Sequence, residues 1–84
     1  MLYHIYIIYS ALLDKFYVGS TSDSLIERIR RHNSIHTGFT GRANDWKLVY
    51  EENFDDKTMA IKREREIKSW KSRKRIELLI GLTK

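Results

Sequence analysis

Residues 3–9, Tyr-His-Ile-Tyr-Ile-Ile-Tyr, and residues 15–19, Lys-Phe-Tyr-Val-Gly, are two runs rich in β-branched and aromatic side chains. Such runs suit a half-buried pleated surface, so they predict two strands joined by a short connection. In an antiparallel pair the numbers of facing residues have a constant sum, and a turn centred near Leu12 makes that sum odd. Tyr6 and Tyr17 then point from one face of the sheet, where two phenols need hydrogen-bond partners, solvent or a ligand.

Length and composition narrow the class of protein. The chain has 84 residues, a net charge of +5 and no cysteine. This length predicts a single domain over residues 1–84, and the missing cysteines exclude disulfides and thiolate metal sites. The positive charge favours a polyanionic partner, nucleic acid first, although plain solubility would also explain it. We see no signal-peptide pattern and no apolar run of the about 20 residues that span a bilayer, so we expect a cytoplasmic protein without membrane contact.

The segment after the two strands predicts a helix and then a loop. Residues 25–32 predict a helix, and Ser24 with Glu27 has the spacing of a capping box at its start, although Ser22 or Asp23 could also serve as the N-cap. Residues 34–45 carry two glycines and show no periodicity. They predict a long loop, of the kind that is often functional or mobile in a small domain.

The remaining residues complete a mixed fold. Residues 46–51 predict a third strand with three residues on one face, Trp46, Leu48 and Tyr50. A second helix is expected from about residue 59 to residue 68, after a capping residue that is Asp55, Asp56 or Thr58. A last helix is expected between Ser72, as its N-cap, and Gly81, at its C-terminal end. The order β-β-α-β-α-α predicts an α+β domain with a small three-stranded antiparallel sheet flanked by helices.

Glu64 is the most informative residue of the second predicted helix. On a helical wheel it falls within the apolar stripe, between Ile67 and Ile61. A carboxylate there is costly unless a cation, a metal ion or hydrogen bonds compensate its charge. The alternative is a salt bridge to a nearby arginine, or a stripe edge that reaches solvent.

The first predicted helix has a similar feature. Arg28 and His32 lie one turn apart on one face, beside its apolar stripe. The alternatives are a snorkelling arginine and a histidine that is satisfied within the core. Together with the two phenols and Glu64 they form a set suited to an oxyanion or a phosphate. A carboxylate can hold a divalent cation, a guanidinium can stabilise charge on phosphorus, and a phenol can position or deprotonate water.

These residues resemble the GIY-YIG nuclease domain superfamily, and within it the small single-domain branch of uncharacterised bacterial proteins. His4-Ile5-Tyr6 stands where the family has its first tripeptide, and Tyr17-Val18-Gly19 where it has its second. Arg28 and His32 match the family's helical arginine and the histidine four residues later. Glu64, followed by Ile67-Lys68, is similar to the segment around the family's metal-binding glutamate.

The chain departs from the family pattern in three places. His4 replaces the first glycine, at a position that varies in this branch. Ser20 stands where the DNA-repair members carry a lysine, so any catalytic role of that lysine is absent. The asparagine that the family has downstream of the glutamate is not evident.

The resemblance implies a metal-dependent endonuclease that hydrolyses phosphodiester bonds with one divalent cation, Mg²⁺ or Mn²⁺. Glu64 would bind the cation, and Tyr17 would act as general base or orient the attacking water with help from Tyr6. Arg28 would stabilise the transition state, and His32 would tune a tyrosine or contact phosphate.

Binding of nucleic acid, with DNA expected ahead of RNA and the choice between them left open, is predicted from the basic residues Arg42, Lys47, Lys68, Lys71, Arg73, Lys74 and Arg75. Such contacts give affinity without sequence reading. Since the 84 residues leave no room for a DNA-reading domain, we expect little sequence specificity, or targeting by a protein partner.

Two other functions fit the sequence. The chain could be a nucleic-acid-binding module that keeps the nuclease fold without turnover, as the missing targeting domain would suggest. It could also be an interaction protein whose apolar helix faces dock a partner. The intact set of Tyr6, Tyr17, Arg28 and Glu64 favours the nuclease, and the oligomeric state stays open.

Overall fold

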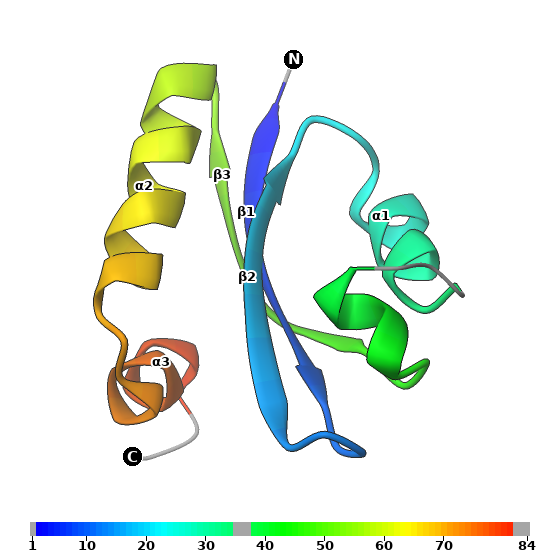
Figure 1. The fold of residues 1–84 in the computed structure, drawn as a ribbon. Coiled ribbons are helices and arrows are strands. Elements are labelled where there is room, and N and C mark those ends of the chain that lie inside the picture. The colour runs from blue at the N-terminus through cyan, green and yellow to red at the C-terminus, as the bar shows by residue number, and fades with distance from the viewer. Residues whose placement is uncertain (1, 35–37, 82–84) are drawn as a thin grey trace.

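The computed structural model describes residues 2–34 and 38–81. In chain order its elements are β1 (Tyr3–Ser10), β2 (Lys15–Thr21), α1 (Leu25–His32), the 3-10 helix η1 (Phe39–Arg42), β3 (Lys47–Phe54), α2 (Lys57–Ser69) and α3 (Arg73–Ile80) (Figure 1). This order confirms the predicted α+β class. Within the described ranges, no helix has the length and apolar character needed to cross a membrane.

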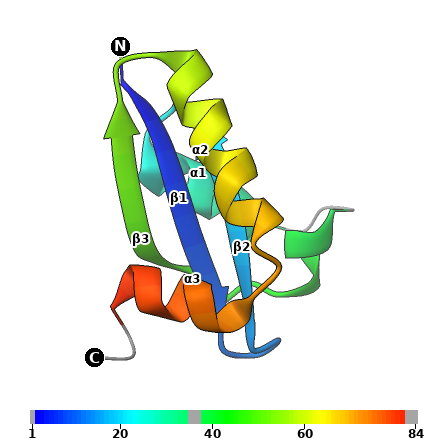
Figure 2. The same cartoon turned by 90° about the vertical axis from the view of Figure 1, so that its left-hand side faces the viewer.

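The three strands form one antiparallel sheet in the order β2-β1-β3. α2 and α3 lie against one face, and α1 with η1 lies against the other (Figures 1 and 2). In the β1–β2 pair, Tyr6 faces Gly19 and Ile8 faces Tyr17, so the predicted odd sum is confirmed. Tyr6 and Tyr17 therefore point from the same face, the one that α1 covers.

The central strand has a buried side chain on both of its faces. Ile5 and Ile7 belong to the core under α2, whereas Tyr6 and Ile8 belong to the core under α1, and none of the four is exposed to solvent. A strand covered on both faces needs a continuous apolar run rather than alternation. This explains why residues 5–8 show no polar position except the tyrosine hydroxyl.

A β-bulge changes the face that part of β3 presents. Ile7 faces Tyr50 but Ile8 faces Leu48, so Val49 is an additional residue in β3. Trp46 consequently packs in the core under α1, while Tyr50 packs against the core under α2. The expectation that Trp46, Leu48 and Tyr50 share one face is therefore wrong, because one inserted residue reverses the alternation of the side chains after it.

The predicted helix ends are confirmed. The Ser24 hydroxyl accepts a hydrogen bond from the Glu27 amide (3.4 Å), and Asp56 is the residue that caps α2. Ser72 caps α3, which ends at Gly81 with φ 81°, in the left-handed region that glycine tolerates best.

The predicted loop over residues 34–45 contains η1 in its described part, residues 34 and 38–45, while residues 35–37 of that prediction lie outside the described residues. Its two ends are joined by Asn33, whose side-chain amide accepts a hydrogen bond from the Trp46 amide (2.8 Å) and donates one to the Trp46 carbonyl (3.1 Å). This pair holds η1 against the same sheet face as α1, next to the tyrosine pair.

Candidate active site

Gly19 makes room for the first tyrosine of the site. Tyr6 lies on the neighbouring strand directly opposite Gly19 and is fully buried. A Cβ atom on residue 19 would lie 2.5 Å from the Tyr6 hydroxyl oxygen and 2.6 Å from the ring carbon that bears it. Both distances are well inside van der Waals contact, so the position of the Tyr6 ring depends on a glycine here.

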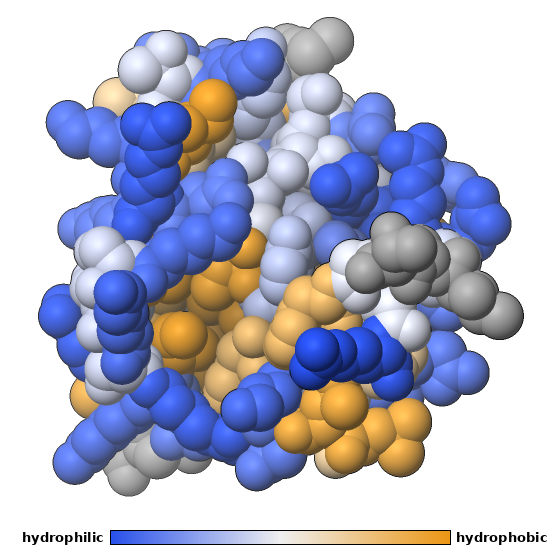
Figure 3. All heavy atoms as spheres, viewed as in Figure 1, coloured by the Kyte–Doolittle hydropathy of each residue, from blue (hydrophilic) through white to orange (hydrophobic). Residues whose placement is uncertain are grey.

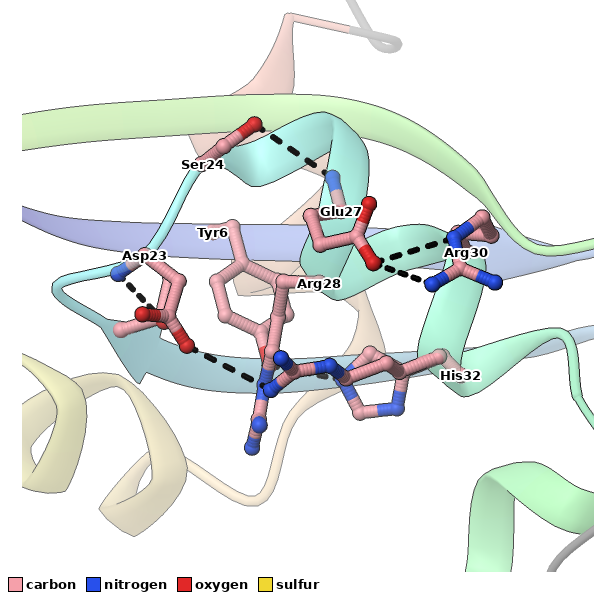
Figure 4. A network of polar contacts seen from close by, with 9 residues as sticks. Tyr6, Asp23, Ser24, Glu27, Arg28, Arg30 and His32 are labelled. Carbon is pink, nitrogen blue, oxygen red and sulfur yellow. Dashed lines mark hydrogen bonds and ion pairs between the residues drawn. The ribbon is translucent and has the colours of Figure 1, made fainter.

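The Tyr6 hydroxyl is bound by two side chains of α1 (Figure 4). It lies 2.7 Å from His32 Nε2 and accepts a hydrogen bond from Arg28 Nε at 3.4 Å. Both partners come from α1 because residues four apart in a helix lie one above the other on the same face. The spacing predicted from the sequence thus joins three of the candidate residues in one network.

Electrostatics keep Tyr6 in its neutral form. Burial raises the pKa of the Tyr6 hydroxyl, and the Arg28 guanidinium lowers it by a smaller amount. Negative charge at Tyr17 and Glu64 would add to the rise. The hydrogen bond to Tyr6 in turn raises the pKa of Arg28. A protonated buried phenol is a poor base, and in the structure this one contacts Arg28 and His32.

A threonine in η1 completes this network. His32 is buried, and its Nδ1 atom lies 2.8 Å from the Thr40 hydroxyl. The Thr40 carbonyl accepts a hydrogen bond from the Trp46 indole (2.9 Å). His32 therefore links the Tyr6 hydroxyl to the Thr40 hydroxyl, and the tautomer of its ring sets the direction of both hydrogen bonds.

Tyr17 is the accessible phenol of the pair. Its ring centroid lies 5.0 Å from that of His32 and 6.4 Å from that of Phe39, whose ring is nearly parallel to it. An open hollow of about 450 Å³ is lined by Tyr17, Arg28, Arg31, His32 and Phe39, among others. Tyr17 and Arg28 therefore face a space that a phosphate group can enter, whereas Tyr6 lies beneath it.

Glu64 reaches this site from the other face of the sheet. One carboxylate oxygen accepts a hydrogen bond from the Ser20 hydroxyl (2.5 Å), and the other lies 2.7 Å from Lys68 Nζ. Only 18% of the Glu64 side chain is exposed. Its charge acts on Tyr6 across β2, but its direct partners are Ser20 and Lys68 rather than an arginine.

The structure thus brings the five predicted catalytic residues to one edge of the sheet, in two groups. Tyr6, Tyr17, Arg28 and His32 lie on the α1 side, and Glu64 lies on the α2 side. β2 is the edge strand between them, and its small residues Gly19 and Ser20 face opposite sides. Figure 3 views this edge: hydrophilic side chains lie to both sides, and the surface between them is pale in its upper part and hydrophobic in its lower part.

The donor set for a divalent cation is a single carboxylate. No cluster of three or more His, Cys, Asp or Glu side chains suitable for a metal ion occurs within residues 2–34 and 38–81. Mg²⁺ commonly takes one or two protein carboxylates and fills its other positions with water and substrate phosphate. Glu64 therefore fits such an ion, with Ser20 fixing the orientation of its carboxylate.

The predicted nucleic-acid-binding residues fall into different environments. Arg42 lies over the Phe39 ring (5.8 Å) beside the hollow, and Lys68 lies over the Tyr17 ring (5.8 Å). Arg73 instead joins α3 to the β1–β2 turn, through the Asp14 carbonyl (2.8 Å) and carboxylate (2.7 Å). Arg75 lies over the Trp70 ring. The remaining three predicted binding residues are exposed on the surface: Lys47, Lys71 and Lys74.

Sequence reasoning missed Ser20, Phe39 and Thr40. The sequence marks Ser20 only as a departure from the family pattern. Its place beside Gly19 in the second strand, where side chains alternate, predicts that it faces the side of the sheet opposite to the tyrosines. Phe39 and Thr40 lie in an aperiodic segment, where no wheel or alternation can assign a direction to a side chain. Their contacts depend on how η1 packs.

Comparison with known proteins gives consistent matches. The model of the GIY-YIG catalytic domain matches residues 2–77, a range that contains all five candidate catalytic residues. The UPF0213 protein SSP2268 of Staphylococcus saprophyticus is 35% identical over 63 residues, which are 75% of this chain and 77% of that protein. The solution NMR structure of the UPF0213 protein BH0048 from Bacillus halodurans aligns with a TM-score of 0.62 and 25% identity, over 99% of this chain and 86% of that one.

Proposed function

This chain belongs to the GIY-YIG catalytic domain family, and from that premise we propose that it is a metal-dependent endonuclease acting on nucleic acid, DNA in the first place. The reaction is hydrolysis of a phosphodiester bond. Water attacks phosphorus, the bond to the leaving 3′-oxygen breaks, and that oxygen takes up a proton.

The observation that carries this proposal is the different environment of the two tyrosines, one buried and hydrogen bonded, the other at the wall of the hollow. Tyr6 is buried and bound to Arg28 and His32, so it acts as a positioning residue. Tyr17 is partly exposed at the wall of the hollow, where it can orient a water molecule and accept its proton. Arg28, held at its Nε atom by Tyr6, can direct its remaining N–H groups to the phosphate, where negative charge increases in the transition state.

Glu64 would hold the divalent cation, Mg²⁺ or Mn²⁺. The cation, when bound, supplies positive charge for the phosphate and the leaving oxygen. The chain itself contributes the orientation of the carboxylate, through the Ser20 hydroxyl on the edge strand. The charged groups beside the hollow, Arg28 and Arg31, suit phosphate contacts, which carry no sequence information, and this supports low sequence specificity.

The test is a cleavage assay on duplex, branched and single-stranded DNA and on RNA, with Mg²⁺, Mn²⁺ or a chelator. Glu64→Gln is compared with Glu66→Gln, since Glu66 lies on the same helix but pairs with Arg63 (2.7 Å). We expect metal-dependent cleavage that is lost in Glu64→Gln and kept in Glu66→Gln. Absence of cleavage on every substrate, or equal activity of the two variants, would reject the proposal.

One observation favours a second candidate, a nucleic-acid-binding module without turnover. Both oxygens of Glu64 already have protein partners, Ser20 and Lys68, so the carboxylate is satisfied without a metal ion. The same substrate panel separates the two functions. Binding of nucleic acid without strand breakage at any metal concentration would identify the module.

A further inference from the structure

The contact between Glu64 and Lys68 is more than an exposed helical ion pair. Glutamate and lysine four residues apart often pair on helices, and exposed pairs of this kind are weak. Here, however, the Glu64 side chain is only 18% exposed, and Ser20 on β2 holds its other oxygen at 2.5 Å. Lys68 Nζ, at 2.7 Å, therefore pairs with the second oxygen of a carboxylate that Ser20 already orients.

Lys68 also reaches the other half of the site. Its ammonium lies 5.8 Å from the centroid of the Tyr17 ring, although Tyr17 points to the α1 side of the sheet and Lys68 belongs to α2. The Lys68 side chain is 49% exposed, so it can change its direction at little cost. Lys68 thus makes two contacts in the described structure: it pairs with Glu64, and it lies over the ring of Tyr17.

We propose that Lys68 and a divalent cation are alternative partners of Glu64, and that the cation's arrival releases the Lys68 ammonium to a phosphate oxygen of the substrate beside Tyr17. The inference depends on the proposed function, in which Glu64 binds the cation. Two positive groups on one carboxylate oxygen repel each other at short range in a partly buried site. The lysine has a flexible four-carbon stem and three donors, so its ammonium can leave the carboxylate and bind phosphate nearby.

Two consequences follow from this exchange. Lys68 lowers the affinity of Glu64 for the cation, because the ion pair must break first. Once released, Lys68 adds one phosphate contact that is missing without the cation. Cation and nucleic acid therefore bind cooperatively, each favouring the state in which the other is held.

The first test measures Mn²⁺ binding directly, by electron paramagnetic resonance or calorimetry, in the absence of nucleic acid. Lys68→Met removes the competing charge and should tighten Mn²⁺ binding about two- to tenfold. Lys68→Arg keeps the charge and should resemble the wild type. Lys62→Met is the matched control, because Lys62 is exposed on α2 two residues from Glu64 and does not share its face.

The outcomes separate this inference from the proposed function. Unchanged or weaker Mn²⁺ binding by Lys68→Met, with binding still lost in Glu64→Gln, would overturn the exchange and leave Glu64 as the ligand. Equal Mn²⁺ binding by Glu64→Gln and the wild type would overturn both proposals.

The second test measures the affinity for a labelled oligonucleotide with and without Ca²⁺, by fluorescence anisotropy. The wild type and Lys62→Met should gain affinity when the cation is added. Lys68→Met should show at most half of that gain on a logarithmic scale. An equal gain in all three proteins would contradict the release of Lys68 to phosphate.

Discussion

Substitution of Gly19 by alanine tests how the strands position the site. The added Cβ atom would lie 2.5 Å from the Tyr6 hydroxyl oxygen, 2.6 Å from the ring carbon that bears it and 3.2 Å from Tyr17 Cε2. Tyr6 cannot move aside freely, because its ring is buried and its hydroxyl is hydrogen bonded to His32 and Arg28. One of the two tyrosines, or the backbone of β2, has to shift.

The change in the free energy of unfolding can be worked out from these contacts. Overpacking in a core costs about 1–3 kcal/mol, and each buried hydrogen bond that the shift breaks costs about 1 kcal/mol more. Alanine in place of glycine in a strand returns about 0.5–1 kcal/mol, through the lower entropy of the unfolded chain. We expect a net loss of about 1–3 kcal/mol in the free energy of unfolding, which for a domain of this size lowers Tm by about 5–20 °C.

The assay is urea denaturation followed by circular dichroism, with Ser20→Ala as the control. Ser20 is the next residue of β2 but faces α2, so its truncation leaves Tyr6 undisturbed; because it also removes the hydrogen bond to Glu64, it serves as the control for unfolding and not for cleavage. Gly19→Ala should shift the urea midpoint with an unchanged slope, and cleavage should fall with it, because Arg28 and His32 lose their common partner. A midpoint for Gly19→Ala equal to that of the wild type would refute the view that glycine is needed for ring clearance.

Three further predictions concern other parts of the molecule. Tyr17→Phe should keep the free energy of unfolding within about 0.5 kcal/mol of the wild-type value and reduce the cleavage rate by about 10²-fold or more. Tyr6→Phe should reduce the cleavage rate and also destabilise the fold by about 1 kcal/mol. Urea titrations and initial rates measure the two effects. Burial acts to raise the pKa of Glu52, but hydrogen bonds from Arg63 and Tyr50 outweigh it and leave that pKa lowered. The wild type should therefore lose stability as pH falls below about 4.5, and Glu52→Gln should show a smaller loss in acid denaturation curves, since the lowered pKa values of Asp14, Glu27 and Asp45 still contribute. Arg73→Ala should lower Tm, because it removes the contact between α3 and Asp14, and should change the salt dependence of DNA affinity little. Lys74→Ala should leave Tm unchanged and reduce the slope of that salt dependence by about 1. The opposite result would show that Arg73 binds phosphate instead.

Local patterns predicted the elements and much of the candidate site. The odd sum in the first hairpin placed Tyr6 and Tyr17 on one face, because side chains alternate strictly along a strand. Helical spacing placed Arg28 and His32 together, because a helix repeats nearly every four residues. These inferences needed no knowledge of which elements pack against each other.

The features that the sequence did not reveal depend on long-range packing. The bulge at Val49 depends on how β3 meets β1, and residue types alone gave no sign of it. Glu64 was expected among the phenols, but it lies on the other face of the sheet and takes Ser20 and Lys68 as partners. The contact of Thr40 with His32 joins residues eight apart across an aperiodic segment, and the hydrogen bonds between Asn33 and Trp46 join the ends of the same segment.

The position of β2 at the edge of the sheet explains how groups on opposite faces can serve one reaction. A central strand would separate them by a continuous wall of backbone and side chains. At an edge, side chains from α1 and α2 can reach around a single strand, which here carries the small residues Gly19 and Ser20. Exposed edges also tend to pair with other strands, a tendency that charged side chains beside the edge oppose. Arg28 and Lys68, one from each helical layer, place positive charge beside this edge, so the charge that suits a phosphate also opposes strand addition.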